Sequence, residues 1–82
     1  MREEAFRAFL AHRLGAASIE SYIDYLQRVE REFGVDLDTV ALDPHGIEAL
    51  RAALLARSVP AKSVGNCVSA VRHYAGMAAR LD

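Results

Sequence analysis

Polar and basic residues recur along the C-terminal segment at alternating steps of four and three residues. The series is Lys62, Asn66, Ser69, His73, Gly76 and Arg80, with Arg72 beside it. Residues at this spacing share one face of an α-helix. Basic groups contact phosphate oxygens, while amides and hydroxyls also bond to base edges. The series therefore indicates either a nucleic-acid contact surface or the ordinary solvent face of an amphipathic helix.

The remaining reactive residue types form no catalytic pattern. A nucleophile needs a base and an orienting group, and no such set is apparent. Cys67 lies on the apolar side of its segment and is expected to be a small core residue. His12, His45 and His73 lack ligand spacing. Cys67 and His73 are six positions apart, so on a helix they point in different directions. We therefore expect no metal, no cofactor and no enzymatic activity.

Charge is distributed unevenly along the chain. Residues 1–19 carry a net charge of +1, residues 20–48 carry −6 and residues 49–81 carry +5, with Asp82 bringing the total to −1. The basic C-terminal segment contains no acidic residue before Asp82. Such asymmetry predicts a dipolar surface whose positive side faces an anion.

Length and composition limit the class of protein. Eighty-two residues are enough for a single domain, which we place at residues 1–82. An apolar content of 52% excludes a disordered tail, and the single cysteine excludes a disulfide framework within one chain. No apolar run approaches the roughly 18 residues of a membrane span, and Glu3 and Glu4 are untypical of a signal peptide. A cytoplasmic location is expected.

Hydrophobic periodicity is helical throughout, so the expected fold class is all-α. No useful stretch alternates with the period of a strand. The apolar spacing predicts helices over residues 2–13, 18–33, 44–57 and 61–79. Joined by short links, they predict a compact bundle of four to five short helices.

The predicted helix ends depend on particular residues. Gly15 and Gly34 are expected to be left-handed C-terminal caps. Ser18 is expected to be an N-cap or a hydroxyl in the first helical turn. Asp43 followed by Pro44 is typical of an N-cap and the first helical residue. The link from Val35 to Leu42 is expected to be a loop or a single turn, with Asp36 and Asp38 in contact with solvent.

The inward faces follow from the same spacing. In the second predicted helix, Leu26 lies at the centre of the apolar stripe, and Tyr22, Tyr25 and Tyr74 are expected to be core or half-core residues. In the third, Leu55 is expected to point inward. The buried side of the last helix is expected to be Val64, Cys67, Val68, Val71, Tyr74, Ala75 and Ala78.

Two motifs resemble a known family. The segment from Ser63 to Tyr74 (SVGNCVSAVRHY) resembles the fourth-helix signature of the core-binding domain of tyrosine recombinases, or phage integrases. Upstream, Ser18-Ile19-Glu20-Ser21-Tyr22 followed by Leu26 is similar to the family's other motif, Thr-aliphatic-x-x-Tyr-x-x-x-Leu. The resemblance covers about residues 3–78.

The resemblance implies a SAM-like bundle that grips one side of duplex DNA. In that family a separate domain cuts and rejoins the strand, and this sequence contains no counterpart of it. The matched positions imply that Ser63, Asn66 and Arg72 face DNA from the last helix, and that Ser18 and Ser21 do so from the second. Together with the helical series, the expected DNA-binding residues are Lys62, Ser63, Asn66, Ser69, Arg72, His73, Arg80, Ser18 and Ser21.

An alternative function uses the acidic middle of the chain. Glu20 and Asp24 place negative charge beside the expected contacts of the second helix, where phosphate is repelled. The acidic region from Glu20 to Glu48 would then be the working surface of a small protein–protein interaction or inhibitor module, and could imitate nucleic acid. The sequence does not indicate an oligomeric state for either function.

Overall fold

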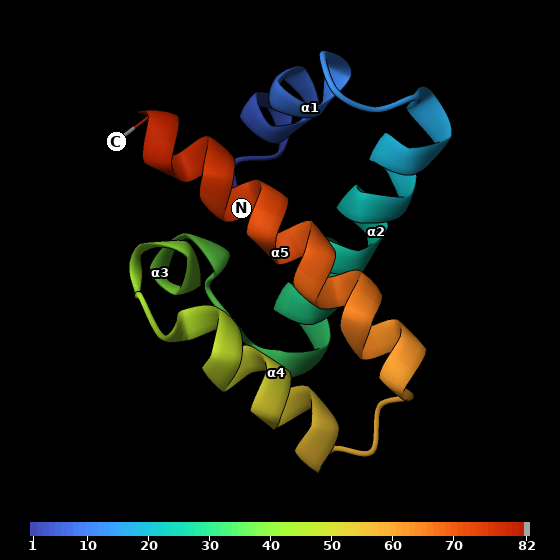
Figure 1. Ribbon diagram of the computed structural model, residues 1–82, viewed down its shortest axis with the longest axis vertical. Helices are drawn as coiled ribbons and strands as arrows, with labels where there is room; N and C mark the ends of the chain where they lie inside the picture. The colour runs from blue at the N-terminus through green and yellow to red at the C-terminus, as the bar shows by residue number, and fades with distance from the viewer. Residues whose placement is uncertain (82) are drawn as a thin grey trace.

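The computed structural model describes residues 1–81, and these form five α-helices with no strand. The expected all-α bundle is confirmed. The helices are α1 (Glu3–Ala11), α2 (Ala16–Phe33), α3 (Leu37–Leu42), α4 (Gly46–Ala56) and α5 (Ala61–Leu81). In Figure 1, α5 crosses the middle of the molecule, with α1 and α2 on one side and α3 and α4 on the other. Each of the other four helices contacts α5.

The central position of α5 explains its wide apolar face. A helix contacted on several sides needs a broader buried stripe than one that covers a single surface. Its buried residues are Val64, Cys67, Val68, Ala70, Val71, Tyr74, Met77 and Ala78. The expected inward face is thus confirmed except at Ala75, which is only half-buried, and it also includes Ala70 and Met77.

The other helices complete one core around this face. Their buried side chains are Phe6 and Leu10 from α1, Ile23, Leu26 and Val29 from α2, Leu37 from α3, and Leu50 and Leu54 from α4. Phe6 packs its ring edge-on against Tyr74, with the ring centroids 5.2 Å apart. Cys67 is buried in this core as expected, and burial raises the pKa of its thiol, which keeps it protonated.

The link between α2 and α4 is a helix, not only a loop or a single turn. Asp36 caps α3, because its Oδ1 accepts the backbone N–H of Asp38 at 3.0 Å and its Oδ2 accepts the hydroxyl of Thr39 at 3.0 Å. Leu37, the first residue of α3, is fully buried. The cap and this apolar anchor hold a helix too short to be stable alone.

Asp38 also has a structural role, beyond the contact with solvent that the sequence predicts for it and Asp36. Its Oδ1 accepts the hydroxyl of Tyr74 at 2.5 Å and the Nε of Arg2 at 3.1 Å. These bonds favour the ionised form and hold the pKa of Asp38 below its usual value, with the Tyr74 bond as the largest cause. The contact joins the start of the chain, α3 and α5.

The end of α1 differs from the expected one. Gly15 is not a left-handed cap: its φ of −74° and ψ of 164° are extended, and it is the N-cap of α2. The helix α1 ends at Ala11, with His12 as its C-cap. Ser18 therefore lies inside the first turn of α2. Gly34 has a φ of 63° and is the left-handed cap that the sequence predicts.

The start of α4 lies two residues after the expected one. Asp43 caps a turn instead of the helix: its Oδ1 accepts the backbone N–H of His45 at 2.9 Å, and its carbonyl oxygen accepts the N–H of Gly46 at 3.0 Å. Pro44 belongs to this turn. Leu55 is 51% exposed, so its expected inward direction is wrong. Leu50 and Leu54, four residues apart, supply the buried contacts of α4.

Gly46 allows the backbones of α3 and α4 to approach each other closely. A Cβ atom at this position would overlap the carbonyl oxygen of Val40, where α3 and α4 meet. We expect Gly46→Ala to lower the free energy of unfolding by about 1–3 kcal/mol, because backbone must move to admit the methyl group. Chemical denaturation measures the change. Gly65→Ala is the matched control, since Gly65 is exposed in α5 with nothing within 4 Å of the added atom. Equal stability of the two variants would contradict the close approach.

Candidate nucleic-acid interface

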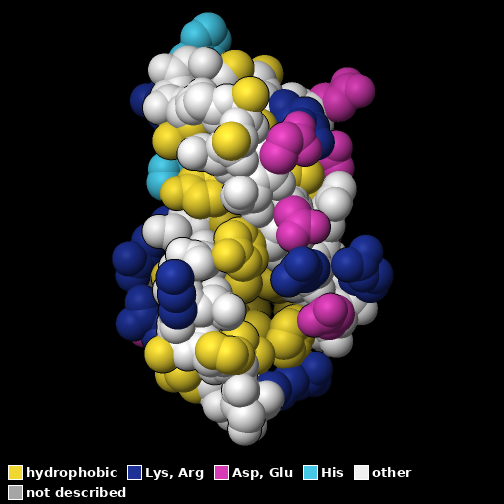
Figure 2. All heavy atoms as spheres, turned by 90° about the vertical axis from the view of Figure 1, so that its right-hand side faces the viewer, with side chains coloured by type: hydrophobic (Ala, Val, Ile, Leu, Met, Phe, Trp, Pro, Cys, Tyr) yellow, Lys and Arg dark blue, Asp and Glu magenta, His cyan; other side chains and the backbone are white. Residues whose placement is uncertain are grey.

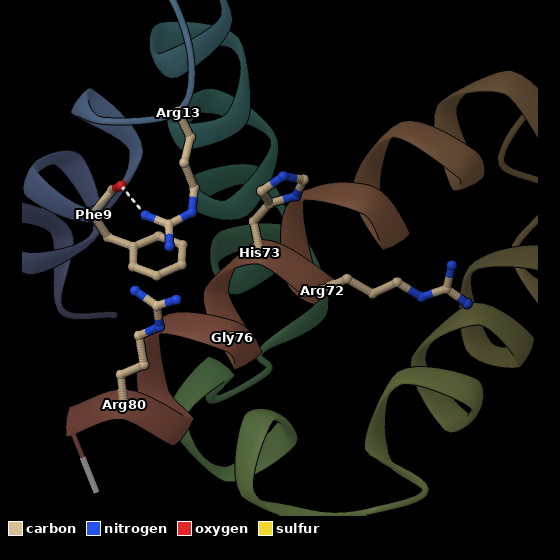
Figure 3. Close-up of a pocket in the computed structure, with 6 residues that line it drawn as sticks. All are labelled: Phe9, Arg13, Arg72, His73, Gly76 and Arg80. Carbon is tan, nitrogen blue, oxygen red and sulfur yellow. Dashed lines mark hydrogen bonds between the residues drawn. The ribbon is translucent and has the colours of Figure 1, made fainter.

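Basic side chains gather around an aromatic ring where α1 meets the end of α5. Arg13 places its guanidinium carbon 3.9 Å from the ring centroid of Phe9, and that of Arg80 is 5.7 Å from the same centroid. The ring lies at an open hollow of about 350 Å³, lined by Phe9, Arg13, Arg72, His73, Gly76 and Arg80 (Figure 3). None of these six residues is acidic, so the lining favours an anion.

The local backbone explains the position of Arg13. After α1 ends, the N–H groups of Arg13 and Leu14 both bond to the carbonyl oxygen of Leu10, at 2.8 and 2.9 Å. This turn keeps Arg13 beside the last turn of α1, where its Nη1 donates to the carbonyl oxygen of Phe9 at 3.0 Å. Arg80 reaches the same ring from the last turn of α5. The two cations are therefore positioned by elements far apart in the sequence.

His73 connects this hollow to a second one. Its ring contacts that of Tyr22, with centroids 5.0 Å apart, and its Nδ1 lies 2.9 Å from the carbonyl oxygen of Ser69. Tyr22 lines this second hollow, which lies between the start of α2 and α5. That hollow is lined by Leu14, Ala17, Ser18, Ser21, Tyr22, Tyr25 and Asn66. The structure thus brings Ser18, Ser21 and Asn66, which the resemblance implies face DNA, to one hollow.

The side chain of Asn66 makes a hydrogen bond within the protein. Its side-chain N–H donates to the hydroxyl of Tyr25 at 2.9 Å, which ties α5 to α2. The residue is half-buried, whereas Ser18 and Ser21 are exposed. Lys62 and Ser69 are exposed along α5, on the edge predicted from the spacing. We call these exposed residues, together with the residues that line the hollow at Phe9 (the Phe9 hollow), the α5 face.

Two expected DNA-binding residues differ from the others: Arg72 lines the Phe9 hollow but directs its charge elsewhere, and Ser63 lies in another hollow. Arg72 turns its guanidinium toward α4, away from the Phe9 ring (Figure 3), and its Nη2 lies 4.0 Å from Oε1 of Glu48. Ser63 is half-buried and lines a different hollow, shared with residues of α2 and α4 such as Phe33 and Leu54. The structure therefore does not group Ser63 with Ser18 and Asn66.

Two acidic residues of α2, Glu20 and Asp24, are each paired with an arginine. Glu20 bonds to the guanidinium of Arg7, and this bond lowers the pKa of its carboxyl. Asp24 lies 3.3 Å from the Nε of Arg28, one helical turn along. The repulsion expected at the start of α2 is therefore reduced by neighbouring cations.

Other acids of the middle segment are also engaged. Glu30 bonds to the α-amino group of Met1 at 2.8 Å, Asp38 to Arg2, and Glu48 approaches Arg72. Figure 2 looks at the molecule from the right of Figure 1, where α2 and the first turns of α5 lie. Lys and Arg gather along its left edge, while Asp and Glu on the right are interspersed with basic side chains. The acidic segment does not present one uniform negative patch in this view.

Phe9 and Arg13 were not among the residues expected to contact a ligand. The sequence places Phe9 on the buried side of the first helix and Arg13 beside it. Their spacing of four residues is the signal that allows a guanidinium to lie over the ring. Nothing in the sequence indicates that Arg80 joins them.

Within residues 1–81, no three His, Cys, Asp or Glu side chains are grouped so as to hold a metal ion. No helix in this part of the chain combines the length and apolar character needed to cross a membrane. Comparisons with protein families, with curated proteins and with solved structures gave no match.

Proposed function

We propose that this chain is a duplex-DNA-binding module that resembles the core-binding domain of tyrosine recombinases. The observation that carries the proposal is the grouping of Arg13 and Arg80 around Phe9, in a hollow that no acidic residue lines within residues 1–81. Two cations near one ring raise the local positive potential, which attracts an anion. A phosphate group of a DNA backbone has that charge and accepts guanidinium N–H bonds.

The rest of the α5 face offers the contacts that position a duplex. Lys62 lies at the opposite end of α5 from Arg80, so one face presents positive charge at both ends. Exposed hydroxyls of Ser18, Ser21 and Ser69 lie between these ends and donate to phosphate or base edges. The chemistry is binding alone, and the proposal assigns no cleavage step to this chain.

The alternative, a protein-interaction module that uses the acidic region from Glu20 to Glu48, has less support. Of the acids in that region, Glu20, Asp24, Glu30, Asp38 and Glu48 lie within 4.0 Å of a cation of this chain. Asp36 and Asp43 accept backbone N–H groups. Carboxylates used in this way are less available to attract a basic partner.

A salt-dependent titration tests the proposal. We expect a fluorescent blunt duplex to bind with a dissociation constant of roughly 10⁻⁴–10⁻⁶ M, the range typical of non-specific binding. Contacts from about four cations predict that the logarithm of the binding constant falls with the logarithm of salt concentration at a slope of about −3 to −4. Fluorescence anisotropy between low and moderate salt measures both quantities. A folded protein that binds no duplex at low salt would contradict the proposed function.

A further inference from the structure

A further, apolar hollow adjoins the Phe9 hollow and shares two of its lining residues. It lies between α1 and the end of α5, has a volume of about 400 Å³ and is lined by Ala5, Ala8, Phe9, Met77 and Arg80. Apart from Arg80, these side chains are apolar. Phe9 and Arg80 therefore stand at the boundary between a cationic hollow and an apolar one.

This pairing matches the chemistry of a nucleotide. A nucleotide joins an anionic phosphate to a flat base whose faces are apolar, with one sugar between them. The guanidinium groups of Arg13 and Arg80 suit the phosphate. The apolar hollow beside Phe9 suits the base, because any of the four bases can pack its flat face on aromatic and aliphatic side chains.

We infer that the two hollows together bind one unpaired nucleotide, with its phosphate at Arg13 and Arg80 and its base in the hollow lined by Ala8 and Met77. This inference rests on the proposed function, because it specifies which part of a DNA molecule the α5 face receives. Bases in a continuous duplex are stacked and paired, so they cannot enter the apolar hollow. Only an overhang, a frayed end or an extruded base has a free nucleotide.

An acidic peptide with an apolar side chain is the other class of ligand that suits these charges. The nucleotide is favoured because the same helix carries one more cation, Lys62, at its other end, and α5 with its 21 residues is long enough for several phosphates. A peptide anchored at Phe9 would use only one end of that helix.

The experiment compares a blunt duplex with the same duplex carrying a three-nucleotide overhang. We expect the overhang duplex to bind at least about fivefold tighter, the gain typical of one stacked base. A third duplex carries an overhang of abasic residues, which retains the phosphates but lacks the bases. We expect that duplex to bind like the blunt one. Fluorescence anisotropy at a fixed low salt concentration measures all three.

A variant of the apolar hollow tests the location. Ala8 is exposed in α1 and lines that hollow, so Ala8→Gln fills it without changing the charge and with only a small loss of helix-forming tendency. We expect the ratio of the affinity for the overhang duplex to that for the blunt duplex to fall to about one. Ala52→Gln makes the same change at an exposed position in α4 and is expected to keep the preference.

The outcomes separate the inference from the proposed function. Equal affinity for blunt and overhang duplexes overturns the inference and leaves duplex binding intact. Full retention of the gain by the abasic overhang, or by Ala8→Gln, also overturns it. Tighter binding of a peptide of alternating Glu and Leu than of the overhang duplex overturns it in favour of a protein ligand. Binding of no duplex overturns the proposed function itself.

Discussion

Leu26→Ala is expected to lower the free energy of unfolding by about 2–5 kcal/mol. Leu26 is fully buried in the middle of α2, which packs against the central helix α5. Truncation removes apolar contact and leaves a cavity that the five helices can close only in part. A domain of 82 residues has a total stability of about 4–12 kcal/mol at ~0.05–0.15 kcal/mol per residue. The substitution therefore removes a large fraction of it.

The same substitution at an exposed leucine provides the control. Leu42, at the end of α3, is 66% exposed, and we expect Leu42→Ala to change stability by less than about 0.5 kcal/mol. Urea denaturation followed by circular dichroism measures both variants, and the native spectrum shows whether each still folds. A change below about 1 kcal/mol for Leu26→Ala would mean that the inward face of α2 is not the apolar stripe.

Long amphipathic helices could be predicted from the sequence because their stripes extend over several turns. In α2, Ile23, Leu26 and Val29 repeat at three-residue steps and all are buried. Gly34 ends the helix as a left-handed cap, which its residue type predicts. The same periodicity predicted almost the whole inward face of α5. Such a pattern depends on the sequence of one helix, and the identity of the packing partner hardly alters it.

Short elements and helix ends could not be predicted in this way. The six residues of α3 are too few for a periodic signal, and the helix depends on the cap at Asp36 and on burial of Leu37. Gly15 has the residue type of a left-handed cap, but the direction of the chain from α1 into α2 requires extended backbone there. These features are decided by how neighbouring elements pack.

The candidate site was predictable in the same partial sense. Spacing along one helix correctly grouped His73 and Arg80, because both lie on the same side of α5 and line the same hollow. The partners from α1, Phe9 and Arg13, depend on how α1 crosses α5, which no local pattern specifies. Arg72 shares the basic segment but turns toward Glu48 on α4, so its charge is partly compensated.

This difference among the arginines determines which substitutions have the largest expected effect on binding. Arg13→Glu combined with Arg80→Glu removes both cations near Phe9 and places two anions there. Loss of two phosphate contacts predicts a fall in affinity of roughly 100-fold at 50 mM salt and a salt slope that is less steep by about 2. Reversal of the charges adds repulsion to this loss. Anisotropy with the blunt duplex measures both effects.

The fold should survive this double substitution, because Arg13 and Arg80 are exposed and an exposed cation–π contact contributes only about 0.5–1 kcal/mol. Arg31→Glu with Arg57→Glu changes the net charge equally, at exposed positions in α2 and just after α4, outside the residues of the α5 face. Arg57 also lies over an aromatic ring, that of Phe33, so this control loses a cation–π contact as well. We expect this control to weaken binding by severalfold at most, through net charge alone. If both double variants lost affinity equally, overall charge would govern binding and the Phe9 hollow would have no special role. Unchanged affinity in the Arg13 and Arg80 variant would place the duplex on another surface.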